Sequence, residues 1–433
     1  TTRGIINLQN FNLSNPNNSF VSPPKKLLQN KFNKFAEEII KQLQKNGHDA
    51  YLVGGCIRDQ LIDIPAKDFD VATSATPEQI RKIFKASRII GKRFKLVHVY
   101  KGSQVIEVST FRASGAKSNQ EKIVKDQLGK ILRDNVWGTI EEDCERRDFT
   151  INSLYFDPIQ KKLFDRHQGV NDSYKRKIVS IGDPMLRFEE DPVRSLRAVR
   201  FATKLNFKID KQIKDAIYKK GYLLSSISNA RRFDEFNKIF MHGKAQHNFE
   251  KLETFDLLKH LVSHVGHSNS YGYRLQMSAL INTDNRVHEG KSVTPGFLLA
   301  AILWPKLIEI ATVEDSISTR RFFPNMDKIL RDQQILTAVP RRFYTYIKDI
   351  WSLQLRLQSR IKNQPFKVLQ HPRFRAAYDL LLLRIEASNS ESEIGDWWTK
   401  FQSCNRQTKL EMIKRHRENS SNSKKFGLSG ELG

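Results

Sequence analysis

The chain has 433 residues, 39% of them hydrophobic, so it is long enough for two to four domains with packed cores and too apolar to be disordered throughout. Its 73 lysines and arginines against 47 aspartates and glutamates give a net charge of +26, which favours an anionic partner, with nucleic acid ahead of a membrane or a merely solvated basic surface. The 3 cysteines without a CxxC spacing argue against a zinc site and indicate a reducing, cytoplasmic location, and no apolar run approaches the roughly 20 residues of a membrane span.

The first residues are polar, rich in asparagine and serine, and lack the apolar core of a signal peptide. Residues 1–26 are therefore expected to form a flexible N-terminal tail. Beyond a pair of prolines, apolar residues recur at helical spacing and predict a helix over residues 32–43.

Two strands and a helix are expected next. Residues 51–53 and 68–72 are short apolar or alternating runs that predict strands. Thr76, Pro77 and Gln79 then predict the start of a helix, with threonine as the N-cap, proline at the first helical position and glutamine at the third.

Around these strands lies a pattern typical of phosphate and metal binding. Gly54 and Gly55 leave room for backbone N–H groups to approach a phosphate, and Arg58 adds positive charge. Asp68 and Asp70 share one face of their strand because side chains alternate. Two adjacent carboxylates repel each other unless a cation neutralises them, and Mg²⁺ prefers such oxygen ligands. The pattern predicts a site for a nucleoside triphosphate and its metal ions.

A third carboxylate is a candidate for the same site. Residues 96–100 and 105–111 are expected as a pair of strands, and Glu107 lies on the face opposite its apolar neighbours. An exposed strand glutamate is the alternative interpretation. Residues 113–132 are polar and predict a flexible loop, and residues 153–156 are expected as the last strand of this portion.

From about residue 185 the pattern is helical almost throughout. Asp191 and Pro192 predict a helix start by the same capping rule. Asp191, Arg194 and Arg197 step by three and so share one helix face. A structural salt-bridge ladder explains this spacing as well as ligand binding does.

Later segments continue the helical pattern. A helix is expected over residues 230–241, where Arg231 and Glu235 are four apart, and helical periodicity returns at residues 297–302 and 343–357.

Four motifs occur in a fixed order over some 150 residues: LVGGCIRD from Leu52, DFDVATSATPEQI from Asp68, RRDFTINSLYFD from Arg146 and EEDPVRSLRAVRF from Glu189. Together they resemble the class II nucleotidyltransferases, the group that contains the tRNA CCA-adding enzymes and the bacterial poly(A) polymerases. Residues 89–98, with ILRDNVWGTIEED (131–143), IWSLQLRLQ (350–358), LQHPRFRAAYDLLLLR (369–384) and WWTKFQ (397–402), resemble the bacterial poly(A) polymerases in particular. Cys56 departs from the pattern, because a third glycine is typical there.

The resemblance implies roles for the residues near the phosphate. Asp68 and Asp70 would hold two Mg²⁺ ions, for which Mn²⁺ could substitute, with Glu107 as a third catalytic carboxylate. The expected triphosphate contacts are Gly54, Gly55 and Arg58.

Further roles concern the ribose and the base. The residues that resemble the ribose-binding motif are Arg147, Asp148 and Asn152. Asp191 and Arg194 would read the base edge by hydrogen bonds, and Arg197 would support them or touch phosphate. Arg231 and Glu235 resemble a motif that braces that helix.

The implied fold is α+β, with a small mixed-sheet nucleotidyltransferase head followed by helical regions. After the tail, the expected divisions are the head (27–160), a helical neck with base recognition (161–270), a helical body with a C-terminal RNA-binding region (271–402) and a basic polar tail (403–433). The last of these is expected as either a disordered RNA-holding arm or a solvated terminus.

The implied activity is template-independent addition of AMP from ATP to RNA 3′ ends, with release of pyrophosphate, in RNA turnover. The expected partners are ATP, RNA 3′ ends with little sequence preference, and RNA-decay machinery or an RNA chaperone, and the protein is expected to be a monomer. The alternatives are a tRNA CCA-adding enzyme that uses CTP and ATP, and an RNA-binding protein with an inactive head. The presence of both aspartates argues against the last.

Overall fold

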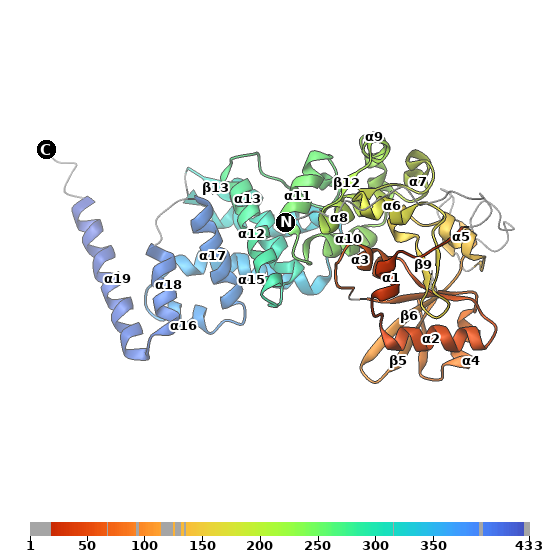
Figure 1. Cartoon of the computed structure of the whole chain (residues 1–433). Coiled ribbons are helices and arrows are strands. Elements are labelled where there is room, and N and C mark those ends of the chain that lie inside the picture. Colours follow the sequence, from red (N-terminus) through yellow and green to blue (C-terminus); the bar gives the residue numbers. More distant parts are fainter. Residues whose placement is uncertain are drawn as a thin grey trace, which may run out of the picture. The chain divides into compact units, whose positions relative to one another are not determined.

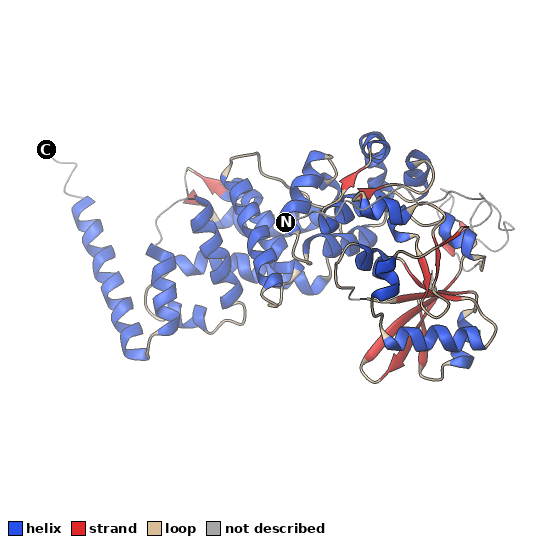
Figure 2. Ribbon diagram, in the orientation of Figure 1, coloured by secondary structure: helices blue, strands red, loops and turns tan. Residues whose placement is uncertain are grey.

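The computed structural model describes residues 19–427 except 67, 92–94, 114–123, 126–130, 134–135, 315 and 389–392. The chain divides into two compact units between residues 220 and 221, which we call the N-terminal and C-terminal units. The N-terminal unit contains the large sheet, and the C-terminal unit is almost entirely helical (Figures 1 and 2). The expected α+β class with a mixed-sheet head is confirmed.

In the described part of the N-terminal unit, eight strands form one mixed sheet in the order β1-β10-β9-β2-β3-β6-β5-β4. The strands are β1 (Phe20–Val21), β2 (Ala50–Val53), β3 (Asp70–Thr73), β4 (Ser87–Ile90), β5 (Leu96–Lys101), β6 (Gln104–Thr110), β9 (Tyr155–Asp157) and β10 (Lys162–Phe164). β3 and β6 are parallel and the other neighbours are antiparallel. The parallel pair at the centre of the order is what positions the carboxylates described below.

Helices cover one face of this sheet with apolar side chains. α2 (Lys34–Lys45) begins at the N-cap Asn33 and buries five residues against the strands. α4 (Pro77–Ile83) lies beside it (Figure 2) and starts with the predicted capping box, in which Thr76 and Gln79 satisfy each other's backbone N–H groups. Both predicted helices are confirmed, because their signals are local in sequence.

The start of the head differs from expectation. Residues 1–18 lie outside the described residues, but Phe20 and Val21 pair with β10, and α1 (Lys25–Gln29) buries Leu27 in the head core. The Phe20 ring packs edge-on against Phe164 at 5.3 Å. The expected tail is therefore wrong from Phe20 onward, since a two-residue strand is too short to leave a periodic signal.

The rest of the N-terminal unit consists of short elements. They are α3 (Gly55–Leu61), β7 (Val124–Lys125), β8 (Ile131–Arg133), α5 (Ile140–Glu145), η2 (Thr150–Asn152), α6 (Gly169–Tyr174), β11 (Lys177–Ile178), α7 (Pro184–Glu190), α8 (Val193–Leu205), β12 (Lys208–Ile209) and α9 (Lys211–Lys220). Two predicted boundaries are wrong: η2 precedes β9, which starts at Tyr155 rather than 153, and β3 starts at Asp70 rather than 68. Within the loop expected at 113–132, β7 pairs with β8, and most other positions lie outside the described residues.

The C-terminal unit packs its helices around a central apolar helix. Its elements are η3 (Gly221–Ser226), α10 (Asn229–Phe240), α11 (Ala245–Thr254), η4 (Leu258–His260), α12 (Tyr271–His288), α13 (Pro295–Ala311), β13 (Thr312–Val313), β14 (Ser316–Ile317), α14 (Thr319–Leu336), α15 (Arg341–Gln358), α16 (Gln364–Leu369), α17 (Phe374–Ser388), α18 (Glu393–Ser403) and α19 (Arg406–Gly427). The middle of α13, from Leu298 to Pro305, is buried on all sides because α12, α14 and α15 pack around it. Within the described part of the chain, no helix has both the length and the hydropathy that a membrane crossing requires.

The basic end of the chain also differs from expectation. Residues expected as a polar tail form α19 as far as Gly427, and 428–433 lie outside the described residues. Ile413 of α19 is buried in a cluster with Trp398 and Phe401 of α18. A few apolar residues among many charges therefore suffice to hold this helix onto the unit.

Candidate active site

The three candidate carboxylates meet at the parallel strand pair. Val71 of β3 lies opposite Val108 of β6, so the residues just before them, Asp70 and Glu107, are neighbours on the sheet. Asp68 lies two residues before Asp70, outside the strand, and the intervening Phe69 packs on the core. All three carboxylates line one cavity of about 400 Å³. The juxtaposition follows from strand register, which the sequence alone does not reveal.

The carboxylates repel one another. Burial, the charge of Glu107 and, more weakly, the charge of Asp68 raise the pKa of Asp70 to about 6, although Arg147 acts in the opposite direction. Burial also raises the pKa of Glu107, whose Oε2 lies 3.9 Å from Nε2 of His98. A bound cation would remove this repulsion.

Two adjacent aspartates and a nearby glutamate supply the hard oxygen donors that Mg²⁺ or Mn²⁺ takes. Among the described residues, no three histidine, cysteine or acidic side chains are close enough to hold a metal ion by themselves. Mg²⁺ usually keeps waters and binds substrate phosphates through one or two carboxylates, so Asp68 and Asp70 fit such an ion with substrate as a further ligand.

The glycine turn lies against the second motif. Gly54 joins β2 to α3 with φ of +75°, a conformation that favours glycine. A Cβ there would lie 3.4 Å from the backbone oxygen of Asn152 and 3.6 Å from Nη1 of Arg147. At Gly55 a Cβ would lie 3.2 Å from Nη2 of Arg58. Gly54 therefore lies in contact with the second motif, and its positive φ rather than a lack of space favours glycine there.

Arg58 is placed differently from a surface phosphate ligand. It is only 2% exposed, and it donates through Nε and Nη2 to Oδ1 of Asp59, at 2.9 and 2.7 Å. Its Nη1 donates to Oδ1 of Asn152. Arg58 therefore orients Asn152, and its predicted contact with the triphosphate stays a prediction.

A chain of hydrogen bonds continues from Asn152 to the helical part of the unit. Asn152 Nδ2 donates to Oδ1 of Asp148 at 3.1 Å, and Arg197 Nε of α8 donates to Asp148 Oδ2 at 2.7 Å. Burial alone would raise the pKa of Asp148, but Arg197, Asn152 and Arg194 outweigh it and hold the pKa below its usual value. The structure thus brings the predicted ribose-binding residues and the Arg197 helix into one network.

Arg147 is held by one partner outside its motif, Asp143, and by two within it, Tyr155 and Asn152. Its Nη2 lies 3.0 Å from Oδ2 of Asp143, its Nε donates to the hydroxyl of Tyr155 at 2.7 Å, and its Nη1 donates to the Asn152 carbonyl at 3.1 Å. Sequence reasoning missed Asp143, although its spacing of four residues from Arg147 on a helical turn is a recognisable signal.

The predicted base-reading pair lies at the start of α8. Asp191 is extended, and its Oδ1 accepts from the N–H of Val193 at 3.3 Å, so it caps α8 from two residues before the helix begins. Arg194 Nη2 donates to the carbonyl of Arg146 at 2.9 Å. Within the described residues, Arg194 Nη1 is buried without a hydrogen-bond partner, and burial helps to lower the pKa of Arg194 to about 10. An unsatisfied buried donor is costly unless a ligand accepts from it.

Two cations of α8, Arg200 and Lys204, were not predicted as part of the site. Arg58, Arg197 and Arg200 lie 5.6, 5.2 and 4.6 Å from the ring centre of Phe201. Arg200 continues the three-residue step from Arg197, so the periodicity of α8 contained the signal. Three guanidinium groups therefore surround the Phe201 ring beside the glycine turn.

Lys204 is the second missed cation. Burial, together with the charges of Arg58 and Arg200, lowers the pKa of Lys204, while Asp59 and Asp68 act in the opposite direction. The ammonium of Lys204 is therefore influenced by charges at the glycine turn and at the carboxylates. A flexible cation there is suited to a triphosphate.

The remaining motif lies in the other unit. Arg231 and Glu235 are on α10, where the buried Glu235 forms an ion pair with Lys238 at 2.9 Å. Their predicted bracing of α8 stays a prediction.

Comparisons with known proteins agree on the family. The matching family models are described as Poly A polymerase head domain (residues 50–179), Probable RNA and SrmB-binding site of polymerase A (206–266) and Polymerase A arginine-rich C-terminus (318–427). The chain is 38% identical to Poly(A) polymerase I of Haemophilus influenzae over 394 residues, which are 88% of this chain and 87% of that protein.

Sequence similarity to CCA-adding enzymes covers a smaller part of the chain. The chain is 35% identical to the CCA-adding enzyme of Bacillus cytotoxicus over 228 residues, or 53% of this chain and 55% of that protein. The fold is similar to the crystal structure of the Bacillus stearothermophilus CCA-adding enzyme in complex with CTP, with a TM-score of 0.58, 24% identity, and coverage of 85% of this chain and 80% of that one. The chain is therefore a nucleotidyltransferase and belongs to the poly(A) polymerase family within class II of these enzymes.

Proposed function

We propose that this protein adds AMP from ATP to RNA 3′ ends without a template, as part of RNA turnover. The RNA 3′-oxygen forms a bond to the α-phosphorus of ATP, the bond from that phosphorus to the oxygen shared with the β-phosphate breaks, and pyrophosphate leaves. The main support is the extent of the match, because identity with Poly(A) polymerase I runs over 88% of the chain whereas that with the CCA-adding enzyme stops at 53%.

Asp68 and Asp70, with Glu107 beside them, would hold the two divalent ions. Bound there, the ions would activate the 3′-hydroxyl and stabilise the leaving pyrophosphate. The carboxylates themselves fix where the α-phosphate lies, and they do so as ionised groups, because neutralisation by the ions opposes the repulsion that raises the pKa of Asp70.

The remaining residues orient the nucleotide. Arg200 and Lys204 of α8 supply charge for the triphosphate in addition to the predicted Arg58. Asp148 and Asn152 present their fixed polar groups to the ribose from one hydrogen-bonded network. Because that network is already formed in the protein alone, nucleotide binding loses little free energy to the ordering of these side chains.

The hydrogen-bonding groups of Arg194 and Asp191 match adenine, the proposed base, and they match cytosine as well. The unpaired Nη1 of Arg194 can donate to a ring nitrogen, and the Asp191 carboxylate can accept from an exocyclic amine. Adenine offers this pair of groups at N1 and N6, and cytosine offers it at N3 and N4. The pair therefore favours ATP and CTP over other nucleotides, which keeps CCA addition as the second candidate.

An incorporation assay separates the two. The purified protein is incubated with ATP, CTP or both, and with either an unstructured RNA or a tRNA that lacks its terminal CCA. Long A-only additions to the unstructured RNA support the proposal. Additions restricted to C, C and A on the tRNA would overturn it in favour of the second candidate. Asp70→Asn serves as the inactive control for both.

A further inference from the structure

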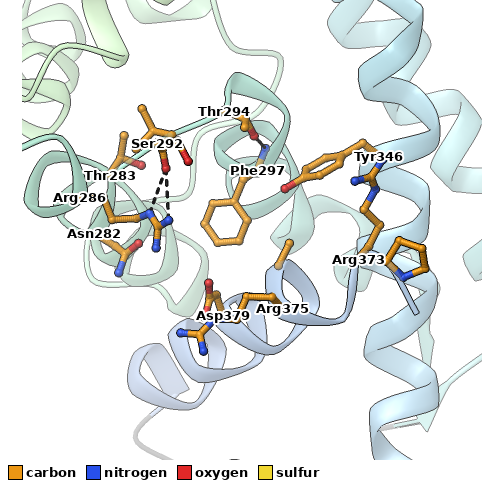
Figure 3. Close-up of a pocket in the computed structure, with 13 residues that line it drawn as sticks. Asn282, Thr283, Arg286, Ser292, Thr294, Phe297, Tyr346, Arg373, Arg375 and Asp379 are labelled. Carbon is orange, nitrogen blue, oxygen red and sulfur yellow. Dashed lines mark hydrogen bonds and ion pairs between the residues drawn. The ribbon is translucent and has the colours of Figure 1, made fainter. Parts of the chain in front are cut away.

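A polar cavity lies in the C-terminal unit, among residues given no role so far. Its volume is about 240 Å³, far more than the roughly 10–15 Å³ that one water needs. It opens between the end of α12, the start of α13, the second turn of α15 and the start of α17 (Figure 3). Three arginines, Arg286, Arg373 and Arg375, line it against a single acid, Asp379. The excess of positive charge indicates an anionic ligand.

The arginines are held in different ways. Arg286 donates through Nε and Nη2 to the carbonyl of Ser292, at 3.3 and 3.2 Å, which fixes its fork at the edge of the cavity. Arg375 forms an ion pair with Asp379 at 3.0 Å. Arg373 has no acidic partner among the described residues, so its charge remains available to a ligand. An arginine fork matches a phosphate group in geometry and charge.

Aromatic rings form the other part of the cavity. Figure 3 shows Phe297 and Tyr346 pointing into the space beside the arginines. The guanidinium of Arg373 lies 4.9 Å from the ring centre of Tyr346, so a cation and an aromatic face are already adjacent. A Cβ at Gly296 would lie 3.0 Å from Cδ1 of Tyr346. The glycine therefore lets the Tyr346 ring sit directly on the first turn of α13.

We propose that this cavity binds one nucleotide of single-stranded RNA, upstream of the reacting 3′ end, with its phosphate on Arg373 and Arg286 and its base against Tyr346 and Phe297. Cationic groups beside aromatic faces are the usual means of holding single strands without reading their sequence. An acidic protein segment would use the arginines but not the rings. The inference rests on the proposed function, because it takes the substrate to be RNA.

Binding of a fluorescently labelled oligo(A) to the full chain, followed by anisotropy, tests the inference. Arg373→Gln and Tyr346→Leu are each expected to weaken binding about tenfold, and Tyr346→Phe, which keeps a stacking face, by less than about twofold. Arg320→Gln, which removes one charge from the exposed surface of α14, is the matched control and is expected to stay within about twofold of the parent. Arg373 is exposed, so its replacement leaves the core intact.

Other outcomes overturn the assignment. If Arg373→Gln and Tyr346→Leu bind oligo(A) as tightly as Arg320→Gln does, the cavity is not on the RNA path. If they lose binding of a fluorescent ATP analogue while oligo(A) binding is unchanged, the cavity is a site for free nucleotide. The binding assay requires no turnover, so failure of the parent to incorporate AMP would refute the proposed function without deciding this inference.

Discussion

Asp70→Asn should abolish nucleotide incorporation and, in metal-free buffer, make the protein more stable. The folded protein raises the pKa of Asp70 from 3.8 to about 6 through burial and the charges of Glu107 and Asp68. That difference corresponds to roughly 3 kcal/mol of unfavourable interaction for the ionised form. Because the Asp70 side chain is exposed on one side, solvent screening reduces the effect to about 1 kcal/mol.

The direction of the Asp70 pKa shift determines how the folding stability depends on pH. An acid whose folded pKa is raised destabilises the fold when ionised, so stability falls as pH rises from about 4 to about 6 and stays lower above that. The advantage of Asp70→Asn is therefore expected at pH 8 and should be absent at pH 4. For a unit of some 220 residues, 1 kcal/mol corresponds to a Tm increase of roughly 2–4 °C.

Thermal unfolding in EDTA and in Mg²⁺ measures this effect. Mg²⁺ should raise the Tm of the parent at pH 8, and it should raise that of Asp70→Asn much less, since binding to the folded state alone stabilises it. Glu78→Gln, at an exposed carboxylate on α4, is the matched control and should change neither Tm nor activity. An Asp70→Asn protein that is less stable than the parent at pH 8 in EDTA would refute the reasoning about repulsion. Incorporation at the parental rate would refute the metal assignment.

Four further substitutions test other parts of the structure. Arg197→Met removes the ion-pair partner of the buried carboxylate of Asp148 and should cost about 3 kcal/mol in urea unfolding at pH 7. Because the folded pKa of Asp148 is lowered, this loss of stability should shrink as the carboxylate is protonated at low pH, and a pH-independent loss would contradict the pairing. Lys204→Met should raise the KM for ATP about tenfold, the effect of one charged hydrogen bond, and an unchanged KM would remove Lys204 from the triphosphate site. Arg194→Gln should lose discrimination between ATP and GTP in competition assays, whereas retained discrimination would move base reading elsewhere. Trp398→Ala should cost about 3–5 kcal/mol in the unfolding of the C-terminal unit, and a cost below about 1 kcal/mol would mean that its burial is incidental.

Much of the architecture could be predicted because its signals are local. The capping box at Thr76 and Gln79 specifies a helix start through contacts three residues apart, and it is present in the structure. The apolar period of α2 likewise needs no distant partner to be recognised. β1 was missed because only its pairing with β10, more than 140 residues away in the chain, marks it as a strand. α19 was missed because few apolar residues interrupt its charged sequence, although Ile413 packs on α18.

The candidate site, too, could be predicted from the sequence only in part. The sequence by itself determined which residue types are present and how closely the motifs space them, including Asp68 two residues before Asp70 and Asp191 three residues before Arg194. Only the tertiary structure decided that Glu107 lies beside Asp70, because parallel pairing of β3 and β6 sets their register.

The same limit applies to Arg58 and to the cavity of the C-terminal unit. A guanidinium next to a glycine pair suggests a phosphate ligand, yet Arg58 turns inward because Asp59 and Asn152 offer it buried acceptors. Arg286 and Arg373 are 87 positions apart in the chain and meet only when α12 and α17 pack against each other. Periodicity reports how one segment is buried, whereas side chains from different segments are brought together by packing, for which a single sequence carries no direct signal.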